Sequence, residues 1–109
     1  MKTTTTPTGR NITQHGRPFH VAEMAASSWG TAYSARCAVD TPANYRQTKK
    51  AVRIALEKQL AGAGYSIVEI LSACPTNWKL SPLDSLNFLR EEMMSEFPLG
   101  EFKNVDSVF

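Results

Sequence analysis

Three consecutive segments carry the clearest hydrophobic patterning in the chain. Thr31–Val39 alternates small apolar and polar side chains, and Tyr65–Leu71 is almost continuously β-branched or apolar. Short segments of this kind are typical of strands that helices cover closely. Between them, Asp40–Pro42 supplies an N-cap candidate and a proline at the first helical position, and an amphipathic stretch continues to Gly62. The pattern predicts a strand, a helix of about 20 residues and a second strand.

The long helix is expected to bury its apolar face and to leave its charged residues on the other faces. Its basic residues between Arg46 and Arg53 suit an acidic or phosphorylated partner, although a solvated helix face is the simpler interpretation. The expected apolar face consists of Tyr45, Val52, Leu56 and Leu60, with Ala51, Ala55 and Gln59 beside it; the basic cluster is Arg46, Lys49, Lys50 and Arg53.

Two shorter helices are predicted on either side of this unit. Residues 1–18 contain threonines, prolines and glycines and are expected to form an extended loop. A first helix is predicted over Phe19–Ser28, and Gly30 ends it. Ser81–Asp84 is a capping box that begins a final helix, which Pro98–Gly100 ends. The apolar face of that last helix is expected to comprise Leu83, Leu86, Leu89, Met93 and Phe97.

The order of these elements predicts an α/β fold. Strand, helix, strand and helix form a βαβα unit, in which the two strands run parallel. Two parallel strands make a poor independent sheet, because both edges stay open and both faces need helices. We therefore expect an extended loop over residues 1–18, and over residues 19–109 the C-terminal part of a doubly wound domain that is incomplete on its N-terminal side. Because of its open edges, the isolated chain is expected to be oligomeric, strand-swapped or loosely packed.

The composition is that of a folded domain rather than a disordered chain. The 109 residues are 42% apolar and carry a net charge of +2, which gives no strong field to attract nucleic acid or a membrane. No apolar run reaches the roughly 20 residues that span a bilayer, and Met1–Thr6 does not resemble a signal peptide. Cys37 and Cys74 form no metal-binding pair. A cytoplasmic location is expected.

The individual residues do not specify a reaction. His15 and His20 have no metal-ligand spacing and are interpreted as surface or capping histidines. Cys74 follows a strand at the end where open α/β sheets bind ligands, so a reactive thiol and a buried structural thiol both stay open. On the last helix, Asp84 is expected to act as a cap, and the other carboxylates are expected to face water and to form no catalytic pair. Those other carboxylates are Glu91, Glu92 and Glu96.

A series of short strings runs in order along the chain from Thr3 to Lys103. The strings are Thr3–Pro7 with Gly9–Arg10, His15–Gly16, Pro18, Ala22–Glu23, Ala32–Tyr33, Ala35–Arg36, Tyr65–Ser66, Val68–Ser72, Cys74–Trp78, Ser81–Leu83 and Pro98–Lys103. Together they resemble the C-terminal part of the β subunit of 2-oxoacid:ferredoxin oxidoreductases. The closest resemblance is to members that act on branched-chain 2-oxoacids such as 2-ketoisovalerate, or on 2-oxoglutarate.

The resemblance implies an oxidative decarboxylation of a 2-oxoacid to an acyl-coenzyme A, with ferredoxin as the electron acceptor. In this family thiamine diphosphate and Mg²⁺ supply the carbanion chemistry, and the protein orients the cofactor. The β subunit works in an assembly with an α subunit and cluster-bearing subunits. These partners, and no nucleic acid or membrane, are what the resemblance implies for the complete protein.

The chain departs from the family where the cofactor binds. The Gly-Asp-Gly-Asp motif, its later asparagine and the Thr-Gly-Gly-Gln stretch would precede Thr3 and do not occur in the 109 residues. An Mg²⁺–phosphate clamp without its carboxylate does not form, so the isolated chain is expected to be inactive. By resemblance, only the loop from Thr3 to Arg10 lies near the cofactor. Within it Thr6, Pro7, Thr8 and Gly9 are the candidate pocket-lining residues. Lys79 is a further departure, because it stands where relatives usually have glycine, which changes the loop conformation expected there.

Two further interpretations stay open beside a fragment of an oxidoreductase subunit. A stand-alone interaction module would use the open sheet edge or the basic helix to bind a partner. A gene remnant would have no selected role.

Overall fold

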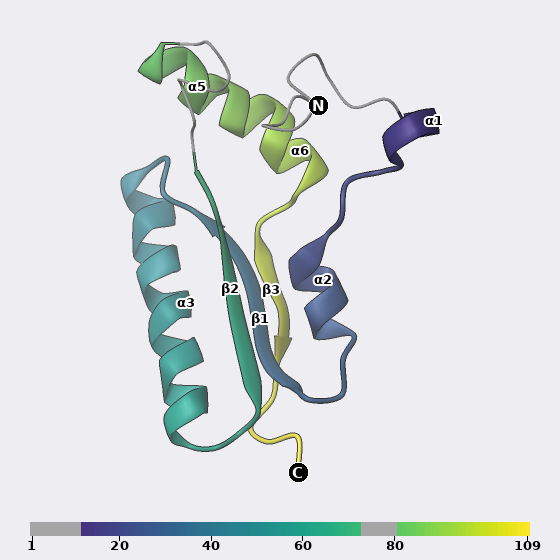
Figure 1. Cartoon of the computed structure of the whole chain (residues 1–109). Helices are drawn as coiled ribbons and strands as arrows, with labels where there is room; N and C mark the ends of the chain where they lie inside the picture. The colour runs from purple at the N-terminus through teal and green to yellow at the C-terminus, as the bar shows by residue number, and fades with distance from the viewer. Residues whose placement is uncertain (1–11, 73–80) are drawn as a thin grey trace.

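The computed structural model describes residues 12–72 and 81–109. Within these ranges the chain forms helices on both faces of a small sheet (Figure 1). In chain order the elements are α1 (Ile12–His15), α2 (Val21–Ala26), β1 (Thr31–Ala38), α3 (Pro42–Leu60), β2 (Tyr65–Leu71), α5 (Pro82–Phe88), the π-helical turn η1 (Leu89–Met93), α6 (Met94–Glu96) and β3 (Gly100–Asn104).

The described sheet has three strands in the order β2-β1-β3. β1 and β2 are parallel, as predicted, and β2 covers the predicted range Tyr65–Leu71. The prediction of two strands was incomplete, because β3 pairs antiparallel with the other side of β1. β1 is buried along its whole length, whereas β2 is half-exposed. α3 and α2 contact β2 from its two faces, as expected, but they cover it incompletely, and β2 is an edge strand of the described sheet.

α3 begins and ends where the sequence predicts. The Thr41 hydroxyl accepts a hydrogen bond from the backbone N–H of Asn44, Pro42 occupies the first turn, and Gly62 follows the helix with a φ of 66°. α3 packs on β1 and β2 through the buried Thr48 and Ala51, with Ile54 and Ala55 partly buried against the same core. The prediction was therefore right for Ala51 and Ala55 and wrong for the four large residues of the expected face. The expected face is exposed at Tyr45, Val52, Leu56 and Leu60.

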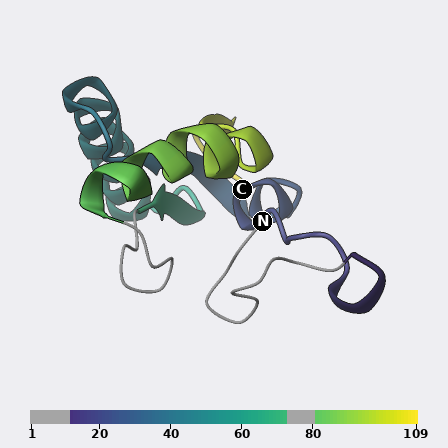
Figure 2. The same ribbon diagram turned by 90° about the horizontal axis from the view of Figure 1, so that it is seen from above.

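The two faces of the sheet carry different helices. α3 packs on one face, where Tyr33, Ala35 and Cys37 form a core with Ala51 (Figure 1). α2 packs on the opposite face and is shorter than the predicted helix over 19–28. The stretch from α5 to α6 crosses the carboxyl ends of β1 and β2 (Figure 2). Its core contacts there join Ala38, Leu71, Leu89 and Phe97.

The final helix is continuous from Pro82 to Glu96 but changes its winding midway. The Ser81 hydroxyl caps α5 by accepting a hydrogen bond from the backbone N–H of Asp84, as predicted. The π-helical turn η1 then separates α5 from α6, which the sequence did not indicate. Leu89 and Phe97 from the predicted apolar face are buried, whereas Leu83 is exposed. Within the segment predicted as an extended loop, residues 12–15 form the short helix α1.

Candidate functional site

A fully buried arginine lies at the centre of a charged cluster. Arg36 comes from the middle of β1, and its side chain has no exposed surface. Its guanidinium donates hydrogen bonds to both carboxylate oxygens of Glu23 on α2, to Glu69 on β2 (Nε–Oε2 3.1 Å) and to the carbonyl oxygen of Pro98 (3.1 Å). Buried guanidinium groups need such partners, because an unpaired charge in a protein interior is strongly unfavourable.

Aromatic rings complete the surroundings of this arginine. The guanidinium carbon lies 5.2 Å from the ring centroids of both Phe97 and Phe102. The hydrogen bonds from Arg36 lower the pKa of Glu23 to about 2, in spite of its partial burial. Burial disfavours the charge on Arg36 itself, but the hydrogen bonds and charges of Glu23 and Glu69 outweigh it and raise the pKa of Arg36. Arg36 and Glu23 therefore stay ionised across the physiological pH range.

A histidine connects this cluster to the end of the last helix. His20 Nδ1 lies 2.9 Å from Glu23 Oε2, and its Nε2 lies 3.2 Å from Glu96 Oε1. Hydrogen bonding to Glu23 first, and to Glu96 second, raises the pKa of His20. Its ring also packs on Phe97 at 4.9 Å between centroids. When it is protonated, His20 forms an ion pair with Glu96, which lies 76 positions later in the chain.

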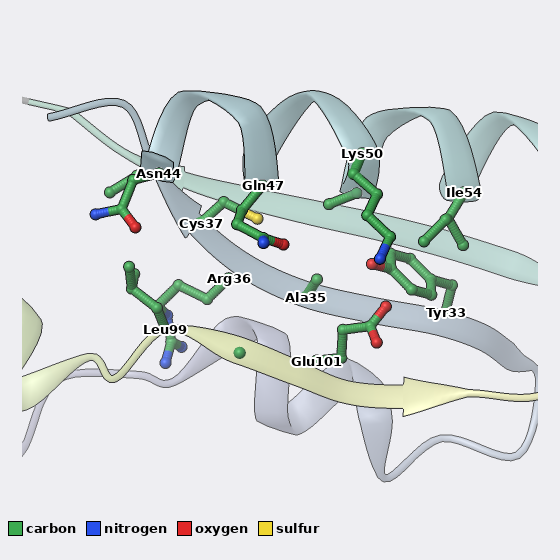
Figure 3. Close-up of a pocket in the computed structure, with 13 residues that line it drawn as sticks. Tyr33, Ala35, Arg36, Cys37, Asn44, Gln47, Lys50, Ile54, Leu99 and Glu101 are labelled. Carbon is green, nitrogen blue, oxygen red and sulfur yellow. The ribbon is translucent and has the colours of Figure 1, made fainter. Parts of the chain in front are cut away.

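A pocket opens on the opposite face of the sheet, between α3 and the strands β1 and β3. Its volume is about 310 Å³. Figure 3 shows Lys50 extending from α3 and Glu101 extending from β3 toward the hydroxyl of Tyr33. The lining also includes the amides Asn44 and Gln47 and a group of apolar side chains. The apolar lining side chains are Ala35, Cys37, Ala38, Ala51, Ile54 and Leu99.

The floor of this pocket holds an unpartnered polar atom. Tyr33 has no exposed surface, and its hydroxyl has no hydrogen-bond partner among the described residues. Burial raises the pKa of Tyr33, and the carboxylate of Glu101 adds to this effect. Burial likewise raises the pKa of the Cys37 thiol, so that it is neutral at physiological pH. The pocket therefore offers a neutral hydroxyl and a neutral thiol beside two charged side chains.

Apolar side chains lie on both sides of the open edge of β2. On the α2 face, a hollow is lined by Phe19, Val21, Met24, Ala25, Tyr65 and Ile67. On the α3 face, Val52 and Leu56 are 38% and 60% exposed, and Ile70 is 44% exposed. Isolated exposed apolar residues are ordinary, but a row on each side of a strand with a free edge is typical of an interaction surface. We call this region the β2 margin.

The predicted cofactor-loop residues cannot be placed in this arrangement. Thr6, Pro7, Thr8 and Gly9 lie outside the described residues, as do the Cys74–Trp78 string and Lys79. The same holds for the side chain of His15. The structure therefore leaves the prediction of a cofactor-lining loop, and both interpretations of Cys74, untested.

The predicted charged groups divide into two kinds. Each member of the basic cluster is exposed, and Lys50 also lines the pocket. The expectation that Glu96 simply faces water was wrong, because Glu96 is half-buried and bonded to His20. His20 is likewise more than a surface histidine. Among residues 12–72 and 81–109, no group of three histidine, cysteine or acidic side chains is placed to hold a metal ion.

Sequence reasoning missed the residues that organise both regions. Arg36 and Glu69 each interrupt an otherwise small or apolar strand, and a charge inside a buried strand is itself a signal of an ion pair. Their pairing depends on strand register, which places them directly opposite each other. Glu101 lies on β3, which was not predicted as a strand. Among the described residues, no helix is both long and apolar enough to span a lipid bilayer.

These elements define an α/β protein with a small mixed sheet. The chain is 37% identical over 102 residues to ketoisovalerate oxidoreductase subunit VorA of Methanothermobacter thermautotrophicus, and 38% identical over 105 residues to the subunit of the same name from Methanothermobacter marburgensis. It is 36% identical over 90 residues to 2-oxoglutarate synthase subunit KorB of Archaeoglobus fulgidus. No protein-family model and no solved structure matches the chain.

The similarity covers nearly all of this chain but only a small part of each relative. It includes 94% and 96% of the chain for the two VorA proteins, and 83% for KorB. The matched regions are 21%, 22% and 29% of the respective relatives. The homologues are thus subunits of 2-oxoacid oxidoreductases, and the chain spans about a fifth of the length of the ketoisovalerate oxidoreductase subunits.

Proposed function

We propose that the chain belongs to the 2-oxoacid:ferredoxin oxidoreductase family and forms the C-terminal part of a β-subunit-type domain. The observation that carries this proposal is the similarity to two ketoisovalerate oxidoreductase subunits over at least 94% of the chain. The reaction of the complete assembly is the oxidative decarboxylation of a 2-oxoacid, such as 2-ketoisovalerate, to an acyl-coenzyme A with reduction of ferredoxin. The partners are the α and cluster-bearing subunits.

In this proposal the described segment has a structural role within a larger doubly wound domain. Parallel strands normally lie inside sheets that helices cover on both faces. β2 is parallel to β1, its outer edge pairs with no other described strand, and the β2 margin presents apolar side chains on both faces. These features suit a sheet that continues beyond β2, with further helices packing on Leu56 on one face and on the hollow beside Tyr65 on the other.

In this proposal the described residues do not hold the family's cofactor. They provide no group of three histidine, cysteine or acidic side chains that could hold a metal ion. The ion-pair cluster around Arg36 does not offer a binding site for the cofactor's phosphates. The hydrogen-bond donors of the guanidinium are already used by Glu23, Glu69 and a carbonyl oxygen. We assign no catalytic step to these residues. Thiamine diphosphate and Mg²⁺ belong, in this proposal, to the complete protein, and the 109-residue chain alone does not turn over substrate.

A chimaeric enzyme tests the structural role. The matched region of the Methanothermobacter thermautotrophicus subunit is replaced by this chain, and the assembled enzyme is assayed for ketoisovalerate-dependent electron transfer. We expect activity to be retained, and we expect Leu56→Glu in the chimaera to abolish assembly, because a charge would enter the β2 margin. Glu57→Gln, on the adjacent exposed position, is the matched control. A chimaera that folds but neither assembles nor reduces an acceptor would contradict the proposal.

The isolated chain provides an independent check on the cofactor assignment. Isothermal titration of the 109-residue chain with thiamine diphosphate and Mg²⁺ is expected to show no binding. Tight binding would mean that the chain holds ligands that its sequence motifs do not indicate. A pull-down that retrieves only proteins unrelated to oxidoreductases would instead favour a stand-alone interaction module.

A further inference from the structure

The pocket between α3 and β3 carries opposite charges on opposite walls. Lys50 projects from the helix and Glu101 from the strand, and both lie on the pocket lining (Figure 3). Neither side chain forms an ion pair with another described residue. Arg36 is also a lining residue, but its guanidinium is paired with Glu23 and Glu69 on the other face of the sheet. The available charges are therefore one ammonium and one carboxylate that face the same space.

The hydroxyl of Tyr33 adds a polar group at the base of the pocket. It is completely buried and lacks a hydrogen-bond partner among the described residues. A buried hydroxyl without a partner is unfavourable by about 1–3 kcal/mol. A ligand group that donates to it or accepts from it would remove this cost. Since the raised pKa of Tyr33 keeps the hydroxyl neutral, both roles are open to it.

The rest of the lining selects for a compact apolar body. Ala35, Ala51 and Ile54 present aliphatic surface between the charged walls. The volume of about 310 Å³ lies at the small end of ligand pockets. A nucleotide or another large cofactor would exceed this space. A small molecule with a short aliphatic side chain would bury that side chain here while its polar end meets Lys50, Glu101 and Tyr33.

We propose that this pocket binds a free aliphatic α-amino acid in its zwitterionic form. Its carboxylate pairs with the ammonium of Lys50, its ammonium pairs with the carboxylate of Glu101, and its side chain packs on Ala51 and Ile54. A simple organic anion would meet Lys50 but would be repelled by Glu101. A simple amine would be attracted by Glu101 and repelled by Lys50. Only a ligand with both charges complements both walls.

A set of ligands with one carbon skeleton tests the charge requirement on the unmodified chain. L-leucine, isocaproate and isoamylamine share the same branched skeleton, and the last two lack the ammonium and the carboxylate respectively. Each is titrated into ¹⁵N-labelled protein while the amide shifts of residues around the pocket are followed. We expect L-leucine to bind at least about tenfold more tightly than either analogue, because each analogue loses one charge-assisted hydrogen bond.

Variants on the two walls assign the contacts. Lys50→Met is expected to weaken L-leucine binding about tenfold and not to weaken isoamylamine binding, which does not use Lys50. Glu101→Gln is expected to weaken L-leucine and not to weaken isocaproate. Tyr33→Phe removes the buried hydroxyl and is expected to weaken L-leucine. Lys49→Met, on the neighbouring exposed position outside the pocket lining, is the control and should bind as the unmodified chain does.

The outcomes separate this proposal from the oxidoreductase assignment. Equal binding of L-leucine and isocaproate, or no saturable shift with any member of the set, overturns the amino-acid site even if the chimaeric enzyme is active. Specific L-leucine binding that Lys50→Met and Glu101→Gln both weaken supports it, whatever the chimaera does. The ligand comparison needs no substitution, so a variant that fails to fold does not remove the test.

Discussion

Arg36 and Glu69 occupy directly opposed positions on the parallel strands β1 and β2, and an ion pair of 3.1 Å joins their side chains. Cross-strand pairs of opposite charge stabilise a given register. A slip of β2 by one residue would turn Glu69 to the other face of the sheet and leave the buried Arg36 with one fewer partner. The pair therefore fixes how the two strands align.

Removing the central arginine is expected to destabilise the fold strongly. Arg36→Met should lower the free energy of unfolding by about 3 kcal/mol, because Glu23 and Glu69 then lose their shared counter-charge inside the protein. Urea denaturation monitored by circular dichroism measures this change. Arg53→Met removes an exposed charge of the same kind and is expected to change stability by less than about 0.5 kcal/mol. Similar effects for the two variants would argue against the role of the cluster.

Acid is expected to weaken the protein through Glu23. Arg36 holds the pKa of Glu23 at about 2, below the ordinary value of 4.5. The folded state then binds fewer protons than the unfolded state, so this stabilisation is complete above about pH 4.5 and is lost as the pH falls toward about 2. Glu23→Gln should show a flatter loss of stability over this range than the unmodified chain. Parallel curves of stability against pH for the two proteins would mean that Glu23 is not the source of this acid sensitivity.

Alkaline conditions are expected to release the contact between α2 and α6. Glu23 and Glu96 raise the pKa of His20 above its ordinary value of 6.5. The contribution of the charged His20 is therefore complete below pH 6.5 and is lost as the pH rises through its pKa in the folded state. An NMR titration of the His20 ring, in the unmodified chain and in Glu96→Gln, measures this directly. The Glu96→Gln variant should titrate at a lower pH, and an unchanged midpoint would mean that Glu96 does not act on His20.

The turn before β2 is expected to tolerate a methyl group at one glycine and not at the other. A Cβ at Gly64 would lie 2.9 Å from the Gly30 carbonyl oxygen, which accepts a hydrogen bond from Tyr65 at the start of β2. Gly62 has a positive φ but open space around it. Gly62→Ala should lower the free energy of unfolding by about 1 kcal/mol, and Gly64→Ala by at least about 2 kcal/mol. Thermal melts of both variants test whether Gly64→Ala is the more destabilising. A larger loss for Gly62→Ala would be inconsistent with the close approach of residue 64 to the Gly30 carbonyl oxygen.

The sequence predicted best those elements whose ends carry their own chemical signals. Thr41 and Gly62 mark the ends of α3, and Ser81 marks the start of α5. These boundaries depend on local signals, which are side-chain caps and a glycine turn. β2 was predicted to its last residue because its apolar run is continuous. β3 was missed since its five residues follow a helix closely and carry no alternating pattern.

What escaped prediction depends on contacts between distant segments. Helical spacing shows which residues of α3 share a face, but the small pair Thr48 and Ala51 lies against the sheet while the four large residues of the predicted face are exposed. The pocket could not be predicted either, because Lys50 and Glu101 line the same space only when β3 pairs antiparallel with β1. The largest apolar side chains therefore did not identify the buried face of α3, because a close approach of helix and sheet favours small residues.

The π-helical turn η1 sets the rotational phase of the chain that follows it. One residue more or less in a helix rotates everything beyond it by about 100°. Deleting a single residue from Leu89–Met93 would therefore carry Phe97 away from the guanidinium of Arg36, and Glu96 away from His20, while α5 stayed in place. The length of this turn is consequently fixed by partners that lie just before α2 and on β1. An insertion or deletion there would disrupt the charged cluster while leaving the helix itself intact.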